Sequence, residues 1–187
     1  IATSFPATLS VGVPPALTLQ PADVNSTLGQ SVTFTASATG SMPITYQWQY
    51  NGVDIAGANT STYTIPEVKG NEDGTYRVVI TNLYGVVQSR QAVFKSIFPP
   101  AITLQPADSN ATTGAIVAFT VNANSIVPLS YQWRKNGINL NGATASTLTL
   151  SNVQGDDNGT YSVVVSNLAG DVTSQDASLN SSTEGYS

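Results

Sequence analysis

The sequence predicts an all-β protein made of two tandem β-sandwich domains with about seven short strands each. Two observations carry this prediction. The chain repeats itself with a period of 85 residues, and each repeat alternates apolar and polar residues in short runs separated by turn residues. The length of 187 residues suits two sandwiches of about 100 residues each. We expect an N-terminal extended segment at residues 1–13, a first domain at 14–98, and a second domain at 99–187 that ends in a short polar tail.

The repeat has a constant offset and shows no insertion or deletion between its copies. Trp48 matches Trp133, and Tyr76 matches Tyr161. Longer matches are Gln20-Pro21-Ala22-Asp23 with Gln105-Pro106-Ala107-Asp108, Tyr46-Gln47-Trp48 with Tyr131-Gln132-Trp133, Asn51-Gly52 with Asn136-Gly137, and Gly74-Thr75-Tyr76 with Gly159-Thr160-Tyr161. The pattern indicates an internal duplication.

Each repeat reads as a series of half-buried strands. Val32, Phe34 and Ala36 alternate with threonines, which places the apolar side chains on one face of a strand. Asn51-Gly52 and Asn136-Gly137 are dipeptides typical of hairpin turns, because both residue types tolerate positive φ. No window has a helical apolar period, so the class is all-β.

These residues resemble the immunoglobulin superfamily, especially intermediate-set domains and their bacterial and phage-type relatives. The segment Gly29–Ala36 is similar to strand B of that family, and Trp48 and Trp133 are similar to its core tryptophan on strand C. Residues Asp157–Tyr161 match the Asp-x-Gly-x-Tyr signature that leads into strand F; the first copy has Glu72 at the acidic position. The resemblance implies Greek-key sandwiches in which the hydroxyl of Tyr76 or Tyr161 bonds the backbone in a tyrosine corner.

The chain departs from the family in having no cysteine. The two positions of the usual disulfide hold Ala36 and Val78 in the first copy and Val121 and Val163 in the second. We expect a structural core formed by these four residues with Trp48, Tyr76, Trp133 and Tyr161. Because valine is larger than alanine, we expect the second domain to be better packed at this site, unless Met42 fills the space in the first.

Composition excludes several classes of function. Only 9% of the residues are charged and the net charge is −5, so the basic surface that nucleic acids require is missing. No apolar run reaches the roughly 20 residues of a membrane span. The first residues lack a signal-peptide pattern, and we expect that the numbering starts inside a processed or longer protein. Serine, threonine and asparagine replace charged residues, as in many exported proteins, which favours an extracellular location.

Catalytic and metal-binding candidates are few. The chain has no histidine and no cysteine, and we expect neither an enzyme nor a bound cofactor or metal. The local acidic clusters are Glu67, Glu72 and Asp73 in the first copy and Asp156 and Asp157 in the second. One interpretation is a Ca²⁺ site; the favoured one is that these carboxylates cap the turn of the tyrosine corner through backbone N–H groups.

Exposed aromatic residues are candidates for sugar stacking. Tyr84 aligns with Ala169 and Tyr50 with Lys135, so the duplicated core does not require either tyrosine. We take Tyr84 as the candidate contact for a partner or a glycan.

Residues 1–13 form a remainder that belongs to neither domain. They align with the last strand of each repeat: Ala7-Thr8-Leu9-Ser10 matches Ala92-Val93-Phe94-Lys95 and Ala177-Ser178-Leu179-Asn180. Three interpretations stay open. The segment is the end of a preceding repeat, or it packs on its own domain, or it is an assembly strand donated to a neighbour through Phe5, Ala7, Leu9 and Val11.

The predicted function is a non-enzymatic extracellular structural or adhesion module. In this hypothesis the tandem domains form a rigid rod in a surface array, filament or virion appendage. Copies of the chain join head to tail through the N-terminal strand. The expected partners are proteins, either other copies or neighbouring repeats, with a glycan as an alternative. The second hypothesis is a carbohydrate-binding accessory module of a larger secreted enzyme. Both rest on analogy from the fold.

Overall fold

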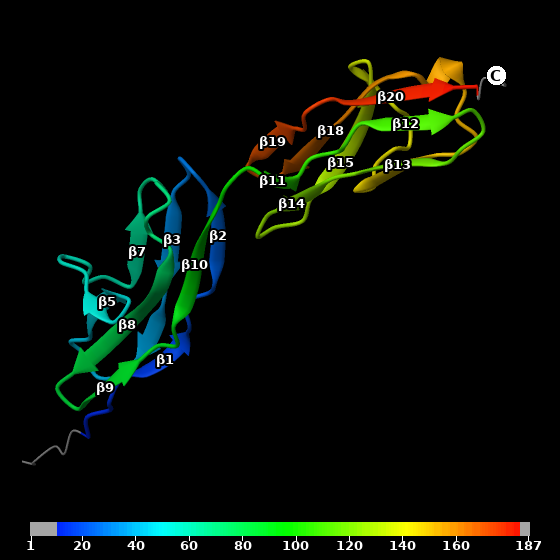
Figure 1. Cartoon of the computed structure of the whole chain (residues 1–187). Coiled ribbons are helices and arrows are strands. Elements are labelled where there is room, and N and C mark those ends of the chain that lie inside the picture. Colours follow the sequence, from blue (N-terminus) through cyan, green and yellow to red (C-terminus); the bar gives the residue numbers. More distant parts are fainter. Residues whose placement is uncertain (1–10, 184–187) are drawn as a thin grey trace, which may run out of the picture. The chain divides into compact units, whose positions relative to one another are not determined.

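The computed structural model describes residues 11–183, so that Phe5, Ala7 and Leu9 of the predicted assembly strand lie outside the described residues. The chain divides into two compact units, with the boundary between Ser96 and Ile97. Figure 1 labels most of the strands of both units. The prediction of two tandem all-β domains is confirmed.

The strands of the first unit are short. They are β1 (Ala16–Leu19), β2 (Val24–Thr27), β3 (Val32–Thr35), β4 (Ser37–Thr39), β5 (Thr45–Tyr50), β6 (Val53–Asp54), β7 (Thr62–Ile65), β8 (Gly74–Asn82), β9 (Gly85–Gln88) and β10 (Ala92–Ile97).

The second unit repeats this order and adds one turn of 3-10 helix. Its elements are β11 (Ala101–Leu104), β12 (Ser109–Thr112), β13 (Val117–Thr120), β14 (Asn122–Asn124), β15 (Ser130–Lys135), β16 (Ile138–Asn139), β17 (Thr147–Leu150), η1 (Gly155–Asp157), β18 (Gly159–Asn167), β19 (Gly170–Thr173) and β20 (Ala177–Ser182).

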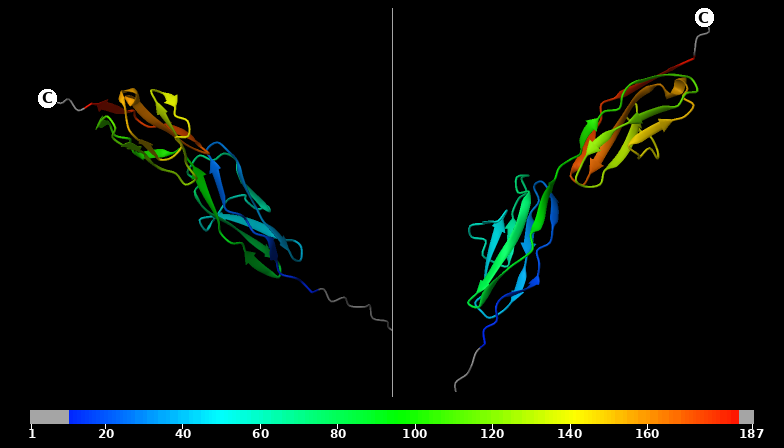
Figure 2. Two further views of the ribbon diagram at one scale, coloured as in Figure 1. Left: turned by 90° about the vertical axis from the view of Figure 1, so that its right-hand side faces the viewer. Right: turned by 60° about the horizontal axis from the view of Figure 1, so that its bottom comes forward.

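Each unit is a sandwich of two layers, which the two views of Figure 2 show from other sides. In the first unit, β1 pairs with β4 and β3 pairs with β7 in one layer. The other layer has the order β2-β10-β8-β5-β6, with β9 also paired to β8. The ten segments make seven strands in family terms, because three family strands are each interrupted: strand A is β1 and β2, strand B is β3 and β4, and strand G is β9 and β10. Strands C, C′, E and F are β5, β6, β7 and β8. Residues 55–61 form no strand in this unit, so β7 is an edge strand.

Antiparallel pairing between the long strands fixes the centre of each sandwich. Trp48 of β5 lies opposite Val78 of β8, and Trp133 of β15 lies opposite Val163 of β18. The hairpin after β5 turns at Asn51, whose φ is 49°, the left-handed conformation that asparagine tolerates better than most residues. The Asn-Gly dipeptides therefore close the turns that the sequence predicts.

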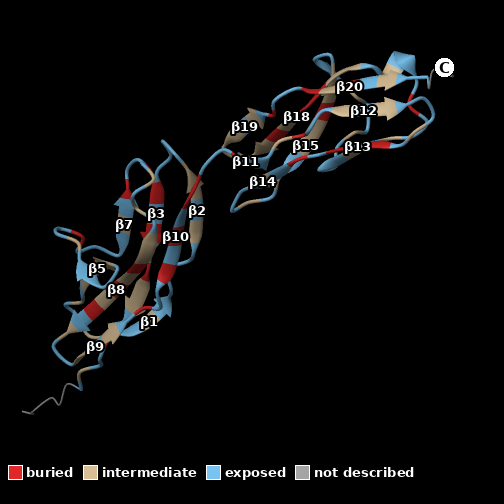
Figure 3. Ribbon diagram, viewed as in Figure 1, coloured by how far each residue is buried: buried red, intermediate tan, exposed pale blue. Residues whose placement is uncertain are grey.

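The core lies between the layers. Figure 3 shows buried residues along β3, β8 and β10. Both tryptophans are 0% exposed, and each indole N–H donates to a backbone carbonyl, Trp48 to Thr60 and Trp133 to Ala145, at 2.9 Å in both cases. The predicted core residues are all buried, with 0–3% exposure: Ala36, Trp48, Tyr76, Val78, Val121, Trp133, Tyr161 and Val163.

Small apolar side chains occupy the positions of the family disulfide in both units. Ala36 and Val78 are 0% exposed in the first unit, as are Val121 and Val163 in the second. Met42 is 78% exposed and does not fill space beside Ala36. The expectation that the second core is better packed at this site stays a prediction.

A tyrosine corner closes the turn before strand F in each unit. The hydroxyl of Tyr76 donates to the carbonyl of Glu72 at 2.9 Å, and that of Tyr161 donates to the carbonyl of Asp157 at 2.7 Å. Burial raises the pKa of both phenols above the ordinary value near 10, with smaller contributions from neighbouring tyrosines and carboxylates at Tyr76 and from Asp157 at Tyr161. The folded state thus favours the neutral, hydrogen-bonded phenol.

We expect stability to fall in alkaline solution for this reason. A raised pKa in the folded state means that the stabilisation is complete below about pH 10, the unfolded pKa, and is lost as the pH rises through the folded value. Tyr76→Phe and Tyr161→Phe should each cost about 1 kcal/mol at neutral pH. Each substitution should also reduce the decrease in the free energy of unfolding of its own unit as the pH rises above about 10. Urea unfolding followed at pH 8 to 11 measures both effects. If the free energy of unfolding falls with pH as steeply in both variants as in the parent chain, the tyrosine corners are not the cause of the alkaline loss.

Candidate functional site: a docking socket for the linker on each domain

The segment that leads into each domain is fastened to the end of strand F. The side-chain amide of Asn82 donates to the carbonyl of Val13 at 2.8 Å and to the carbonyl of Ser41 at 2.9 Å, and its oxygen accepts from the N–H of Tyr84 at 2.9 Å. The N–H of Ser41 adds a bond of 3.0 Å to the same Val13 carbonyl. The polar atoms of the asparagine amide are therefore all engaged.

Glycines allow the proline pair after Val13 to approach closely. A Cβ on Gly85 would lie 3.0 Å from Cβ of Pro14, and one on Gly40 would lie 3.0 Å from the Pro14 carbonyl oxygen. Gly40 also has φ of 150°, where other residues are strained. We call this arrangement of Asn82, the loop at residues 40–41 and Gly85 the linker socket of the first unit.

The second unit has a related socket 85 residues later, in which Ser125 and Ile126 stand at the positions of Gly40 and Ser41. Asn167 donates to the carbonyl of Phe98 at 2.8 Å and to the hydroxyl of Ser125 at 3.0 Å, and it accepts from the N–H of Ala169 at 2.8 Å. A Cβ on Gly170 would lie 3.5 Å from Pro99. Each linker is thus bonded to the domain that follows it.

Tyr84, the predicted glycan contact, lies against the linker of the first unit. A Cβ on Gly12 would come within 2.0 Å of the Tyr84 ring, so the ring packs directly on Gly12. In the second unit the larger residue is on the linker: Ile97, which is 2% exposed, stands at the position of Gly12, and the smaller Ala169 stands at that of Tyr84. Tyr84 remains 49% exposed. Of the predicted assembly strand, the described residue Val11 is 76% exposed.

The repeated motif Gln-Pro-Ala-Asp has a structural role that its sequence does not reveal. Between β1 and β2 the chain crosses from one layer to the other, and the motif is the segment that makes this crossing. Gln20 accepts from the N–H of Arg90, and Asp23 accepts from the N–H of Val93, both at 2.9 Å. The Val93 bond and Arg90 lower the pKa of Asp23 against the opposing effect of burial.

The second unit makes the matching pair of bonds. Gln105 accepts from the N–H of Gln175 at 2.9 Å, and Asp108 accepts from that of Ser178 at 2.7 Å. The motif therefore satisfies backbone donors where strand G is interrupted.

One carboxylate of each acidic cluster caps a turn. One carboxylate oxygen of Glu72 accepts from the N–H groups of Lys69, Gly70 and Asn71 at 2.9–3.2 Å. Burial alone would raise the pKa of Glu72, but these backbone bonds lower it overall. Asp157 accepts from the N–H of Gln154 at 2.8 Å in the second unit. Within residues 11–183, no group of three or more acidic side chains is placed to hold a metal ion.

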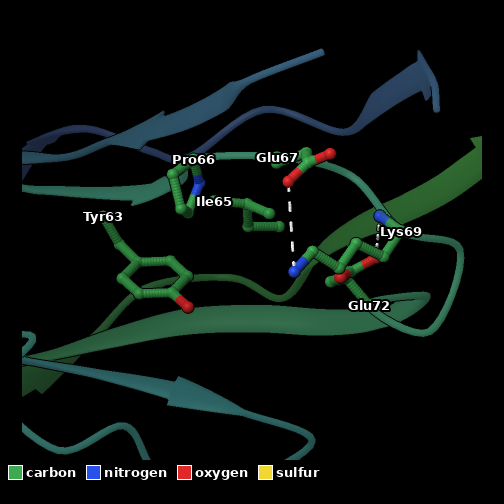
Figure 4. Close-up of a pocket in the computed structure, with 6 residues that line it drawn as sticks. All are labelled: Tyr63, Ile65, Pro66, Glu67, Lys69 and Glu72. Carbon is green, nitrogen blue, oxygen red and sulfur yellow. Dashed lines mark hydrogen bonds and ion pairs between the residues drawn. The ribbon is translucent and has the colours of Figure 1, made fainter. Parts of the chain in front are cut away.

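A groove of about 520 Å³ lies beside the edge strand β7 in the first unit (Figure 4). Its lining is Tyr63, Ile65, Pro66, Glu67, Lys69 and Glu72. Lys69 and Glu67 form an exposed ion pair at 3.9 Å. The second unit keeps an acid at the last position but has Leu148, Ser151, Asn152 and Gln154 at those of Tyr63, Pro66, Glu67 and Lys69. The fold therefore does not require the tyrosine or the ion pair. This groove was not predicted from the sequence, although the different residues at equivalent positions of the two repeats could have indicated it.

Comparison with known proteins identifies the fold family. A model of the immunoglobulin domain matches residues 14–82 and 99–167. The chain belongs to the immunoglobulin domain family. An I-band fragment from titin superposes with a TM-score of 0.72 at 21% identity, covering 90% of this chain and 65% of that one. Within residues 11–183, no helix has the length and apolar character needed to cross a membrane.

Relatives of this immunoglobulin-type chain are much longer. Endoglucanase C of Cellulomonas fimi is 33% identical over 127 residues, which are 64% of this chain and 11% of that protein. Hemicentin-1 of Homo sapiens is 27% identical over 183 residues, which are 87% of this chain and 3% of that protein. The chain thus spans a small part of the relatives that it matches.

We predict that Asn82 holds the linker of the first unit. Asn82→Ala removes all three bonds, so the N–H groups of Ser41 and Tyr84 should both exchange faster with solvent, by about 2- to 13-fold for a loss of about 0.5–1.5 kcal/mol. Asn82→Asp keeps an acceptor for Tyr84 and places a carboxylate against the Val13 carbonyl, so only Ser41 should lose protection. Hydrogen exchange followed by NMR separates the two variants. Unchanged exchange at Ser41 in both would show that the socket does not hold the linker.

Proposed function

We propose that the chain is a non-enzymatic spacer or adhesion module of an extracellular protein, whose domains are joined end to end with restricted bending. The linker socket is the observation that carries this proposal. A flexible tether needs no such attachment, whereas Asn82 and Asn167 each bind a linker carbonyl at 2.8 Å. Prolines stiffen both linkers further.

The use of polar side chains supports a structural role. Glu72, Asp157, Asp23 and Asp108 all accept backbone N–H groups, so these carboxylates serve the fold rather than a reaction. The surface relies on uncharged polar residues, and the chain has only six Lys and Arg. These features favour a protein partner, such as a neighbouring repeat or a second copy, and an extracellular location.

The orientation of the two units should depend on Asn167. Because the chain has no cysteine, Asn59→Cys with Thr144→Cys places one spin label on an exposed loop of each unit. We expect Asn167→Ala to broaden the distance distribution measured by electron paramagnetic resonance, because Phe98 loses its anchor. Asn82→Ala is the matched control: it makes the same change in the other socket, which does not join the two units, and the distribution should stay unchanged. Equal widths in parent and Asn167→Ala would contradict the spacer proposal.

A second candidate is an accessory module of a larger secreted enzyme, of a bacterial type. The similarity to Endoglucanase C of Cellulomonas fimi favours it. In that case, the groove beside β7 is the better place for a sugar than Tyr84. It combines an aromatic ring with carboxylates and a lysine, a mixture that suits polyhydroxylated ligands.

This candidate is tested by Tyr63→Leu. The second unit has Leu148 at the equivalent position, so we expect the variant to fold, with a loss of about 1–3 kcal/mol because the Tyr63 ring no longer packs on Trp48 and Tyr76. Binding to soluble β-glucan oligosaccharides, measured by titration calorimetry, should be lost with the ring if the groove holds a sugar. Tyr84→Ala should leave it unchanged. No binding by the parent chain, or binding that survives Tyr63→Leu, would exclude the groove as the sugar site.

A further inference from the structure

The outer edge of strand β7 in the first unit has no neighbouring strand within residues 11–183. β7 pairs with β3 on its inner side, in a sheet of two strands. Residues 55–58, which precede β7, are bonded to the other layer instead. The N–H of Ile55 donates to the carbonyl of Trp48, and the N–H of Trp48 donates to that of Ala58, both at 2.9 Å. These residues therefore form no ladder beside β7.

Main-chain groups of β7 point toward this edge at alternate residues. The N–H of Ala36 donates to the carbonyl of the opposite residue, Ser61, at 2.9 Å, so the two form a hydrogen-bonded pair. Such pairs alternate with non-hydrogen-bonded pairs along an antiparallel ladder. Thr62 and Thr64 therefore belong to non-hydrogen-bonded pairs, and their N–H and C=O groups face away from β3.

Side-chain contacts agree with this register. The hydroxyls of Thr33 and Thr64 lie 2.9 Å apart, as expected for the close side chains of a non-hydrogen-bonded pair. The carbonyl of Thr62 accepts from the hydroxyl of Thr60 at 2.8 Å, which fits a carbonyl that faces away from β3. The N–H of Thr62 and both main-chain groups of Thr64 thus remain for a partner.

The second unit has the same register at the equivalent strand. The N–H of Val121 donates to the carbonyl of Ser146 at 3.0 Å, and the hydroxyls of Thr120 and Thr147 lie 3.1 Å apart. In the part of the chain that the structure describes, β17 pairs with β13 and with no other strand. The orientation of the edge groups is therefore a property of the fold.

The edge of β7 lacks the features that protect most edges from pairing. Natural edge strands are blunted by charged side chains, by proline or by very short length. At the edge of the other layer, β6 has only two residues, Val53 and the acidic Asp54. β7 has four uncharged residues, of which Thr62 and Thr64 are exposed, and proline follows only after its end, at Pro66. Such a strand is suited to accept another one.

The groove beside β7 can receive side chains of an added strand. Successive side chains of a strand point to opposite faces, so every second one would point toward the other layer. Tyr63 and Ile65 of β7 already do so, and they line the groove (Figure 4). Its wall also has two carboxylates and one ammonium group, those of Glu67, Glu72 and Lys69, which disfavours an acidic segment.

We propose that the edge of β7 is a docking site for an extended segment of a partner protein, which adds to the layer as one more strand. The segment has apolar side chains at alternate positions, which enter the groove, and no net negative charge. Its main chain bonds Thr62 and Thr64. A sugar in the groove would need neither of these main-chain groups. This inference rests on the proposed role as an adhesion module and gives the kind of partner and its site.

Peptides displayed on phage test this site. The whole chain is the bait, and the library has about six random residues, the length of an ordinary strand. We expect enriched peptides with apolar residues at every second position. A synthetic copy should slow hydrogen exchange at the N–H of Thr64 by about 10-fold or more near saturation. Methylation of the peptide nitrogens that face β7 should abolish binding, whereas methylation of the intervening nitrogens should preserve it.

Thr64→Pro removes the central donor of the edge. The ladder with β3 does not use this N–H, so the variant should fold. Its affinity for the peptide, followed at the Tyr63 amide signal, should fall by about 10-fold or more. Thr149→Pro is the matched control: it makes the same change in the second unit and should leave this affinity unchanged. The methylated peptides test the parent chain itself, so the result does not depend on the folding of a variant.

Three outcomes would overturn the proposal: no enriched peptide, equal binding to the parent and to Thr64→Pro, or equal effects of methylation on the two edges of the peptide. A dimer of the parent chain in sedimentation that Thr64→Pro dissociates would overturn it too, because a second copy would then occupy the edge. The spin-label experiment reports bending between the units and this one reports binding, so either proposal can fail alone.

Discussion

One carbonyl oxygen at the entrance to each domain organises the end of the sandwich that receives the linker. The oxygen belongs to Val13 in the first unit and to Phe98 in the second, and an asparagine amide from the end of strand F binds it at 2.8 Å. The asparagine also fixes the turn between strands F and G and the loop after strand B. The path of the linker, the approach of the first proline and the shape of the turn therefore depend on one another. Replacing the amide should therefore affect all three at once.

The duplication provides an internal comparison that separates what the fold requires from what each domain adds. Equivalent residues with equal roles, such as the Gln-Pro-Ala-Asp crossings and the tyrosine corners, belong to the architecture. The packing of Tyr84 on Gly12 belongs to the first unit alone, because the equivalent residues of the second unit are Ala169 and Ile97. The groove beside Tyr63 is a third kind of feature, because the second unit builds the same turn without the aromatic ring or the ion pair.

The architecture could be predicted from the sequence because its strongest signals are local or repeated. Period-2 runs, Asn-Gly turns and the 85-residue offset locate the strands, and the tryptophans and tyrosines mark the core. The socket could not be predicted, because Asn82 and Val13 are 69 residues apart and their contact exists only after folding. The roles of Gln20 and Asp23 were hidden for the same reason. Tyr84 was predicted to be an exposed contact for a partner or a glycan; it is 49% exposed, but the sequence does not show that Gly12 lies under its ring. The interruptions of strands A, B and G, and the missing strand before β7, depend on pairing between layers that no single segment encodes.

The parallel pairing of β12 with β20 has a mechanical consequence. Residues 109–112 run beside residues 179–182 in the same direction, near opposite ends of the domain's chain. Tension applied through the linker and through the C-terminal end would pull these two strands in opposite directions along their common axis. Their backbone hydrogen bonds would then carry the force together, in shear, rather than open one after another. Because the chain has no cysteine, no disulfide shares this load, and these hydrogen bonds are the part of the second unit that stretching would test first.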